Sequence, residues 1–227
     1  MWSTTLALEL SPMSHPRTYT SDAIDVQYDL KRCIHAAECV HGAPQTFDPN
    51  RKPWVDPSQD NAGTIAQVVM RCPTGALLFM RKDGGAEEAN DVANTVSIQP
   101  DGPLYVRGNV EFTGSDGEVV SRETRVALCR CGLSENKPFC DNRHQEGFSD
   151  VAALGIHTAA EPLGESNTLQ VVLAENGPLL LRGPVTITAV DGATSTTEKC
   201  ALCRCGQSSN KPFCDGTHKE VGFVAAG

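Results

Sequence analysis

The sequence lacks the segments that would send a chain to a membrane or anchor it there. No stretch approaches the roughly 18 apolar residues of a membrane span. The first 20 residues contain no basic segment followed by a sustained apolar run, and Glu9 interrupts the most apolar part. A secretory signal is therefore not expected. Together these absences predict a cytoplasmic protein without membrane contact, in a compartment that keeps cysteines reduced.

Positive charge is scarce as well. The chain has 19 Lys and Arg against 28 Asp and Glu, for a formal net charge of −9. Without a basic tract, no nucleic-acid partner is expected. The acidic surface suits docking to a positively charged protein, or serves only to keep the chain in solution. No glycine-rich nucleotide fingerprint and no hydrolytic triad is recognisable, so the sequence does not predict an enzyme.

What the chain does contain is a cassette of cysteine and histidine that occurs twice. Residues 129–144 read CRCGLSENKPFCDNRH and residues 203–218 read CRCGQSSNKPFCDGTH. The shared candidate ligands are Cys129, Cys131, Cys140 and His144 in the first copy, and Cys203, Cys205, Cys214 and His218 in the second. The third cysteine and the histidine are four residues apart, so they face the same way on a helical turn. In a reducing compartment such a pattern predicts metal centres rather than disulfides. Three cysteines and one histidine also form an established zinc set, so the residues alone leave zinc open.

The aspartates that follow the third cysteine, Asp141 and Asp215, are placed to cap that turn. The cassettes resemble the CDGSH iron–sulfur family, whose signature is C-x-C-x2-(S/T)-x3-P-x-C-D-G-(S/A/T)-H. The second cassette follows this signature throughout, and the first departs from it at Asn142 and Arg143. Asparagine tolerates the left-handed backbone that glycine would supply. Arg143 places a cation beside the first site, so we expect the two sites to differ in reduction potential.

The resemblance implies one [2Fe–2S] cluster in each cassette. Cys129 and Cys131 would bind one iron, and Cys140 and His144 the other. In the second cassette, the corresponding pairs would be Cys203 with Cys205 and Cys214 with His218. Tandem members of the family mimic the dimer of single-motif relatives, which implies a monomer with an internal pseudo-twofold pair of sites.

The repeat extends beyond the cassettes. NTVSIQPDGPLYVRGNVEF at 94–112 matches NTLQVVLAENGPLLLRGPVTI at 167–187 in the type and order of its residues. Alternating and β-branched residues predict strands in both. We therefore expect two β-rich CDGSH modules, residues 94–150 and 167–227, each with a cluster-binding loop and a short helix. Residues 151–166 would link them.

The first module, residues 23–82, is different. Val26–Leu30 and Leu77–Met80 read as strands. Ile65, Val68, Val69 and Cys72 recur with helical period, and the following proline ends that helix. Residues 1–22 are expected to form a flexible tail, and the acidic glycine-rich residues 83–93 a linker. The fold class predicted for the whole chain is α+β.

Three cysteines of this first module, Cys33, Cys39 and Cys72, form a second kind of set. Bacterial ferredoxins carry C-x2-C-x2-C with a distant Cys-Pro. The module resembles the divergent single-cluster ferredoxin-like domain that is often found with CDGSH motifs. Ala36 stands where the middle cysteine would be. The resemblance implies a [3Fe–4S] cluster on the three cysteines. The alternatives are a [4Fe–4S] cluster with His35, water or another group at the fourth iron, and a degenerate fold that holds nothing.

The remaining candidates receive no site. His15, His41 and His157 are given no role, and Cys200 is expected to be a small buried hydrophobe. Bound clusters carry out one-electron chemistry, so the leading hypothesis is an electron carrier that exchanges electrons with redox protein partners, a reductase or an acceptor. Storage or transfer of clusters, or redox and pH sensing through the histidine ligands, is the alternative. A zinc-binding interaction module is the lesser one.

Overall fold

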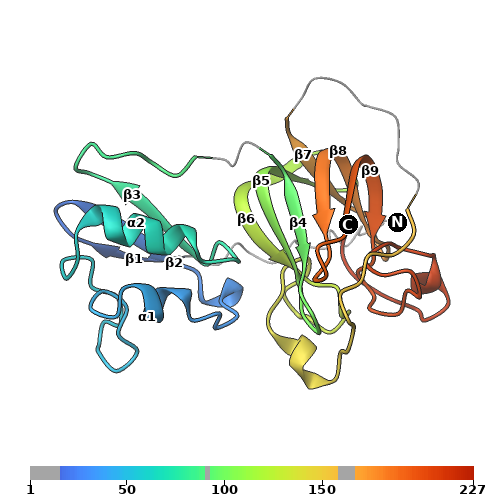
Figure 1. Ribbon diagram of the computed structural model, residues 1–227, viewed down its shortest axis with the longest axis horizontal. Coiled ribbons are helices and arrows are strands. Elements are labelled where there is room, and N and C mark those ends of the chain that lie inside the picture. Colours follow the sequence, from blue (N-terminus) through green and yellow to red (C-terminus); the bar gives the residue numbers. More distant parts are fainter. Residues whose placement is uncertain (1–15, 90–92, 158–166) are drawn as a thin grey trace, which may run out of the picture.

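The computed structural model describes residues 16–89, 93–157 and 167–227, which form an N-terminal domain beside a larger β-rich unit (Figure 1). The N-terminal domain has an antiparallel sheet in the order β1-β2-β3, built from β1 (Arg17–Thr20), β2 (Ile24–Tyr28) and β3 (Leu77–Arg81). Its helical segments are η1 (Leu30–Arg32), α1 (Glu38–Gly42) and α2 (Ala62–Met70). The sheet and α2 enclose a separate apolar core. The strands and the helix expected in this module are thus present.

Two details of this domain differ from the sequence-based expectation. Residues 1–22 were predicted to be a flexible tail, but Arg17–Thr20 forms β1 and pairs with β2. The apolar anchor of this edge strand is Tyr19, which is 6% exposed. The helix α2 ends at Met70, before Cys72, although the periodicity extended to that cysteine. Residues 1–15 lie outside the described residues.

The larger unit consists of two copies of one three-stranded motif. The first copy has β4 (Thr95–Ile98), β5 (Leu104–Thr113) and β6 (Val119–Leu128), followed by the short helix η2 (Arg143–Glu146). The second has β7 (Leu169–Leu173), β8 (Leu179–Thr188) and β9 (Thr194–Leu202), followed by η3 (Thr217–Lys219). In each copy the long central strand pairs antiparallel with both of its neighbours.

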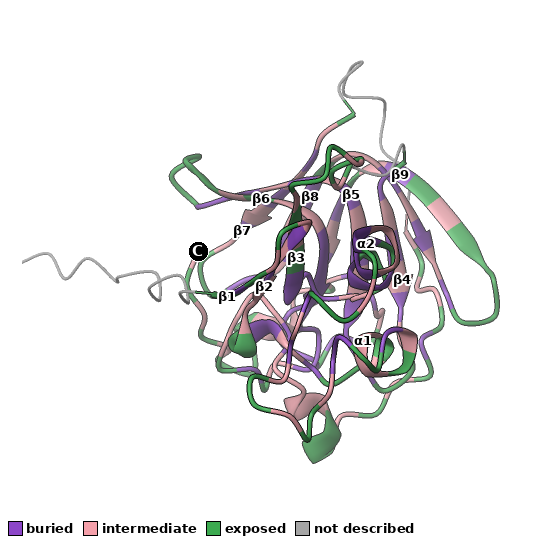
Figure 2. Cartoon of the chain, turned by 90° about the vertical axis from the view of Figure 1, so that its left-hand side faces the viewer, coloured by how far each residue is buried: buried purple, intermediate pink, exposed green. Residues whose placement is uncertain are grey.

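The two copies interlock through their central strands. β4 pairs with the start of β5 and also lies parallel to the end of β8. Reciprocally, β7 pairs with the start of β8 and lies parallel to the end of β5. A single apolar core draws residues from all six strands, and Figure 2 shows their buried positions inside the unit. The reciprocal pairing creates the internal pseudo-twofold relation between the copies.

Each central strand has an irregularity at a glycine, at the point where its pairing on one side passes from one partner strand to another. Gly108 and Gly183 have positive φ values of 136° and 112°. A Cβ at Gly108 would meet Asn94, and a Cβ at Gly183 would meet the carbonyl of Thr168. Glycine alone combines this backbone with such a close approach. Among the described residues, the regular secondary structure is mostly strand with a few short helices, and α+β describes the fold in a broad sense.

Candidate metal centres

In the first cassette the four expected ligands come together as two pairs. The sulfur atoms of Cys129 and Cys131 lie 3.6 Å apart, directly after β6. The sulfur of Cys140 lies 3.3 Å from Nδ1 of His144. A short antiparallel bridge holds the pairs together, because Cys129 donates its amide to the carbonyl of Pro138, and Cys140 donates its amide to the carbonyl of Ala127.

The second cassette repeats this arrangement. The sulfur atoms of Cys203 and Cys205 are 3.7 Å apart, and the sulfur of Cys214 is 3.3 Å from Nδ1 of His218. A buried serine closes the loop in each copy. Ser134 Oγ donates to the carbonyl of Phe139 at 2.7 Å, and Ser208 Oγ donates to the carbonyl of Phe213 at 2.6 Å. Near-identical sequences therefore give near-identical ligand geometry.

The turn between the third cysteine and the histidine is capped as expected. Asp141 accepts the amide of Arg143 at 3.2 Å, and Asp215 accepts the amide of Thr217 at 3.1 Å. Asn142 adopts the left-handed conformation, with φ of 78°, as Gly216 does with φ of 95°. Hydrogen bonds to Thr217 and Ser209 hold the pKa of Asp215 far below its usual range. Both turns are short 3₁₀ segments instead of α-helical turns.

The thiols of the cassettes are buried away from water, except that of Cys214, which is partly buried. Desolvation raises the pKa of Cys140 to about 12 and also raises the pKa values of Cys205 and Cys214. The exception is Cys129, whose pKa is lowered by the hydrogen bond from Cys131. A buried thiolate needs a positive partner, because burial penalises the charged form. A metal-containing group would supply that charge to each set of sulfurs.

The ligands of each cassette are arranged as two pairs. Within the described residues, no three histidine, cysteine or carboxylate side chains converge as ligands of one metal ion. Each cassette instead presents two separate two-ligand pairs. The donor set of each cassette, three sulfur atoms and one ring nitrogen, is compatible with an iron-containing group.

The cassettes are anchored to the sheets by buried arginines. Arg130 donates from Nε to the carbonyl of Gly102 at 2.8 Å, and its side chain lies over the ring of Phe148. Arg204 donates from Nε to the carbonyl of Gly177 at 2.9 Å. Both arginines are 1% exposed. Sequence analysis assigned them no role, although each stands between two ligand cysteines.

The two cassettes also touch each other. A Cβ at Gly132 would meet the carbonyl of Cys205, and a Cβ at Gly206 would meet the carbonyl of Cys131. Both glycines have positive φ, 83° and 81°. The ligand loop of each copy therefore packs on the backbone of a ligand cysteine in the other.

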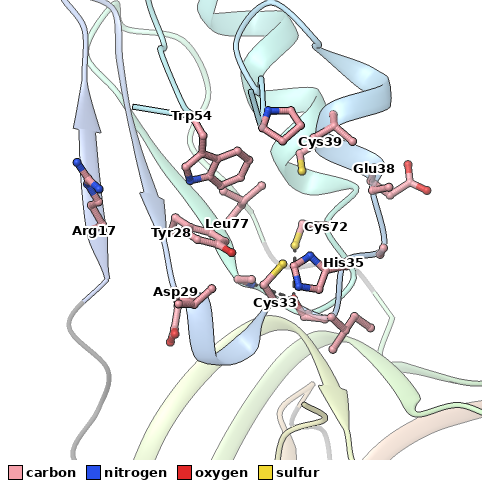
Figure 3. A pocket seen from close by; sticks show the side chains of 18 of the residues that line it. Arg17, Tyr28, Asp29, Cys33, His35, Glu38, Cys39, Trp54, Cys72 and Leu77 are labelled. Carbon is pink, nitrogen blue, oxygen red and sulfur yellow. Dashed lines mark hydrogen bonds between the residues drawn. The ribbon is translucent and has the colours of Figure 1, made fainter. Parts of the chain in front are cut away.

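The three cysteines of the N-terminal domain line one large cavity, of about 1500 Å³ (Figure 3). Cys33 follows η1, Cys39 lies in α1, and Cys72 follows α2. Burial raises the pKa of Cys39 to about 11, and the charges of Cys72 and Cys33 raise it further. The three sulfurs are thus close enough to interact, in a space that accommodates a group larger than an ion.

Apolar and aromatic side chains make up much of the cavity wall. Tyr28 and Trp54 line it with their rings in an edge contact, 4.8 Å between centroids. Burial raises the pKa of Tyr28, and a hydrogen bond with Cys33 adds to this rise. His35 lines the same cavity, from a left-handed backbone with φ of 57°. His35 therefore remains a candidate fourth ligand.

The N-terminal cavity and the first cassette meet at a tight junction. Ile34, next to Cys33, packs against Cys140 and Ala127, with Tyr105 at the edge of this cluster. Asn136 donates to the carbonyl of Lys31 at 2.9 Å. A ligand loop of one site therefore contacts a ligand loop of the other.

Charged side chains reinforce this junction. Arg32 pairs with Glu123 at 3.0 Å and lies over the ring of Phe139, 4.4 Å from its centroid. Arg125 donates to the carbonyl of Leu77 at 2.7 Å and pairs with Glu88. These contacts fix the N-terminal domain on β6. They could not be read from the sequence, because they join residues far apart in the chain.

The remaining cysteine and histidines considered in the sequence belong to none of the three candidate ligand sets. Cys200 is 5% exposed in the core of the β-rich unit, as expected for a hydrophobe. His157, which was given no role, stacks on Phe213 and contacts Thr197. His41 lies in α1, and His15 is outside the described residues. In the part of the chain that the structure describes, no helix is long and apolar enough to cross a membrane.

Comparisons with known proteins agree with this division of the chain. Residues 19–82 match the family described as divergent 4Fe-4S mono-cluster. Residues 101–145 and 176–219 match the family described as iron-binding zinc finger, CDGSH type. The uncharacterized protein YjdI of Escherichia coli K12 is 38% identical over 66 residues, which cover 29% of this chain and 87% of YjdI. YjdI of E. coli O157:H7 matches equally. No solved structure matches the chain.

Proposed function

The chain belongs to the CDGSH iron-binding family, with a divergent 4Fe-4S mono-cluster domain ahead of its two CDGSH domains, and we propose that it is a multi-cluster iron–sulfur protein that transfers single electrons. Clusters bound at its three ligand sets would supply one-electron chemistry. Two [2Fe–2S] clusters in the cassettes and one [3Fe–4S] or [4Fe–4S] cluster in a ferredoxin-like N-terminal domain complete the proposal. A cytoplasmic location and redox protein partners go with it.

The contacts between the segments that carry the three ligand sets support this proposal. Ile34, next to one ligand of the N-terminal site, packs on Cys140 of the first cassette. Gly132 of the first cassette packs on the backbone of Cys205 in the second. These contacts support an arrangement of the sites in the order N-terminal site, first cassette, second cassette. Neighbouring sites allow an electron to pass from one cluster to the next, which a carrier with a single site would not require.

The cations around the sites are paired with carboxylates. Arg32 is 9% exposed, lies over Phe139 of the first cassette and pairs with Glu123 at 3.0 Å. Arg143 pairs with Glu135 at 2.6 Å and lies 3.7 Å from Asp141. Both charges are therefore largely balanced, and we expect a smaller difference in reduction potential between the cassettes than an unpaired Arg143 would give.

The experiment is stepwise reduction of the anaerobically purified chain, followed by visible absorption and electron paramagnetic resonance. Oxidised [2Fe–2S] clusters are silent and an oxidised [3Fe–4S] cluster is paramagnetic. We expect one oxidised signal, which Cys33→Ser abolishes, and magnetic interaction between neighbouring sites after reduction. A [4Fe–4S] cluster would change the first signal and keep the interaction. Reduction accompanied by loss of iron would contradict electron transfer.

Storage or transfer of clusters is a second candidate, favoured by the exposure of one ligand pair. His144, His218 and Cys214 are only partly buried, whereas Cys129 and Cys203 are 1% exposed. A ligand pair at the surface can be exchanged for the ligands of an acceptor. Incubation with an apo-ferredoxin separates the two functions, because a storage protein would lose its colour to the acceptor and an electron carrier would keep it.

A further inference from the structure

The two CDGSH modules are related copies, but only the first carries the N-terminal domain. This difference exposes a surface on the second module whose counterpart is an internal interface. On the first module, the domain is held by Asn136, Phe139 and Glu123. The corresponding residues of the second module, aligned by their cassettes and by β6 and β9, are Asn210, Phe213 and Thr197.

Residues 155–157, here called the strap, make the same contacts on the second module that the N-terminal domain makes on the first. Asn136 donates to the carbonyl of Lys31 at 2.9 Å, and Asn210 donates to the carbonyl of Ile156 at 2.8 Å. In each case the next residue of the chain covers the aromatic ring of the cassette. The strap thus follows the path that the loop before Cys33 takes on the other module.

His157 of the strap takes the position that Arg32 of the N-terminal domain has on the first module. Its ring stacks on Phe213 with 4.6 Å between centroids, as Arg32 lies over Phe139 at 4.4 Å. Nε2 of His157 is 3.2 Å from Thr197 Oγ1, where Arg32 pairs with Glu123. Two segments unrelated in sequence therefore occupy equivalent positions on the two modules.

Beyond the strap, the rest of the equivalent surface is open within the described residues. Arg125 and Ala127 are 1% and 2% exposed beneath the N-terminal domain. Their counterparts Lys199 and Ala201 are exposed and half-buried. A small cavity of about 280 Å³ lies here, between residues 180–182 of β8 and 199–201 of β9.

This open surface has positively charged side chains at the positions whose counterparts bind the N-terminal domain. On the first module, Arg107 donates to the carbonyl of Met70 at 2.6 Å, and Arg125 donates to the carbonyl of Leu77. The second module places Arg182 and Lys199 at the same positions. Cations there would meet the carbonyl and carboxylate groups that such a domain presents.

We propose that this surface of the second module, Leu180 to Arg182 with Lys199 to Ala201, docks a mono-cluster ferredoxin-like protein supplied by a separate chain, and that the strap must release before it docks. This inference rests on the proposed electron transfer. The first module receives its redox partner within the chain, and the second exchanges electrons with the partner from outside. While the strap covers Asn210 and Phe213, the second site is closed to such a protein.

The test uses the cluster-loaded full chain and E. coli YjdI, 87% of which is the matched domain. His157→Ala removes the ring stack, and Gly155→Ala directs a Cβ at the carbonyl of Asn210. Hydrogen exchange at the Ile156 amide, which donates to Asn210 Oδ1, reports whether the strap has released. We expect both variants to bind YjdI about tenfold more tightly than the unchanged chain in calorimetry.

A matched pair of charge reversals then locates the binding. Lys199→Glu on β9 should lower YjdI affinity about tenfold in the His157→Ala background. Arg122→Glu makes the same charge change on β6, where Arg122 is exposed and pairs with Glu111, and should leave affinity unchanged. Absence of YjdI binding in every variant, equal losses for the two reversals, or a released strap without tighter binding would each overturn the docking proposal.

The same samples separate this inference from the proposed function. If YjdI docks at Lys199 but reduced YjdI never reduces the second module, electron transfer fails and the docking surface stands. If reduction proceeds at a rate that neither strap variant nor Lys199→Glu changes, electron transfer stands and the docking surface fails.

Discussion

The guanidinium of Arg32 and the carboxylate of Glu123 form a salt bridge at 3.0 Å, with side chains only 10% and 12% exposed. Arg32 precedes a candidate ligand of the N-terminal site, and Glu123 lies on β6, which leads into the first cassette. Two further nitrogen atoms of Arg32, Nε and Nη2, are buried without a hydrogen-bond partner among the described residues. The salt bridge therefore joins the segments that carry the two sites. The buried charge of Arg32 is balanced by Glu123.

Removing one member of this pair should loosen the domain junction. Glu123→Gln leaves Arg32 buried without its counter-charge, which costs about 3 kcal/mol when a buried pair is broken. We expect the N-terminal domain to unfold in a separate, earlier transition during urea denaturation. Arg122→Glu, one position away on the exposed face, is the control. A single transition at the midpoint of the unchanged chain would show that the salt bridge does not hold the domains together.

The contact between the cassettes should be intolerant of a single methyl group. Gly192→Ala, at φ of 85° with no neighbour within 4 Å, should cost only the left-handed backbone penalty of about 1–2 kcal/mol. Gly132→Ala has nearly the same φ, 83°, but its Cβ meets the carbonyl of Cys205. We therefore expect a larger loss of stability for Gly132→Ala, together with loss of iron from both cassettes. Equal unfolding free energies for the two variants would show that the cassettes do not press on one another.

Acid should release the metal of the cassettes through their histidines. Burial lowers the pKa of His144, so the folded chain favours the neutral ring that binds metal. The stability that depends on the neutral ring is present above about pH 6.5, the unperturbed value, and is lost as pH falls below it. His144→Cys and His218→Cys should each keep visible absorption to lower pH than the unchanged chain. Acid bleaching that neither variant alters would exclude these histidines as ligands.

Cys200 should behave unlike the partly buried candidate ligand Cys214 once metal is removed. Burial raises the pKa of its thiol to about 12, so at pH 8 it is protonated and poorly nucleophilic. We expect iodoacetamide to leave Cys200 unmodified in the folded chain, as mass spectrometry of the digest would show. Cys214, which is less buried, serves as the comparison. Rapid alkylation of Cys200 would mean that β9 opens readily.

The local features of this protein could be predicted from the sequence, because they depend on residues close together in the chain. The spacing of Cys140 and His144 was enough to place them on one turn, and Asn142 could be assigned its left-handed backbone from its residue type. The duplicated strands were equally visible. Each of these features is determined by the backbone preference of single residues or by the spacing of residues along the chain.

Long-range features escaped prediction for a physical reason. The parallel pairing of β4 with β8 and of β7 with β5 joins the two copies, and nothing in β4 alone specifies this second partner. The burial of Arg32 and Arg125 depends on how the domains meet. The role of His157 became visible only when its ring was found on Phe213. Isolated polar residues of this kind look like surface residues until the fold surrounds them.

Iron, acid-labile sulfide and zinc analysis of the folded, anaerobically purified chain tests the central claim most directly. The paired ligands of the two cassettes and the three cysteines of the N-terminal cavity predict iron and sulfide in similar amounts, with little zinc. A folded chain that contains zinc and neither iron nor sulfide would contradict the account.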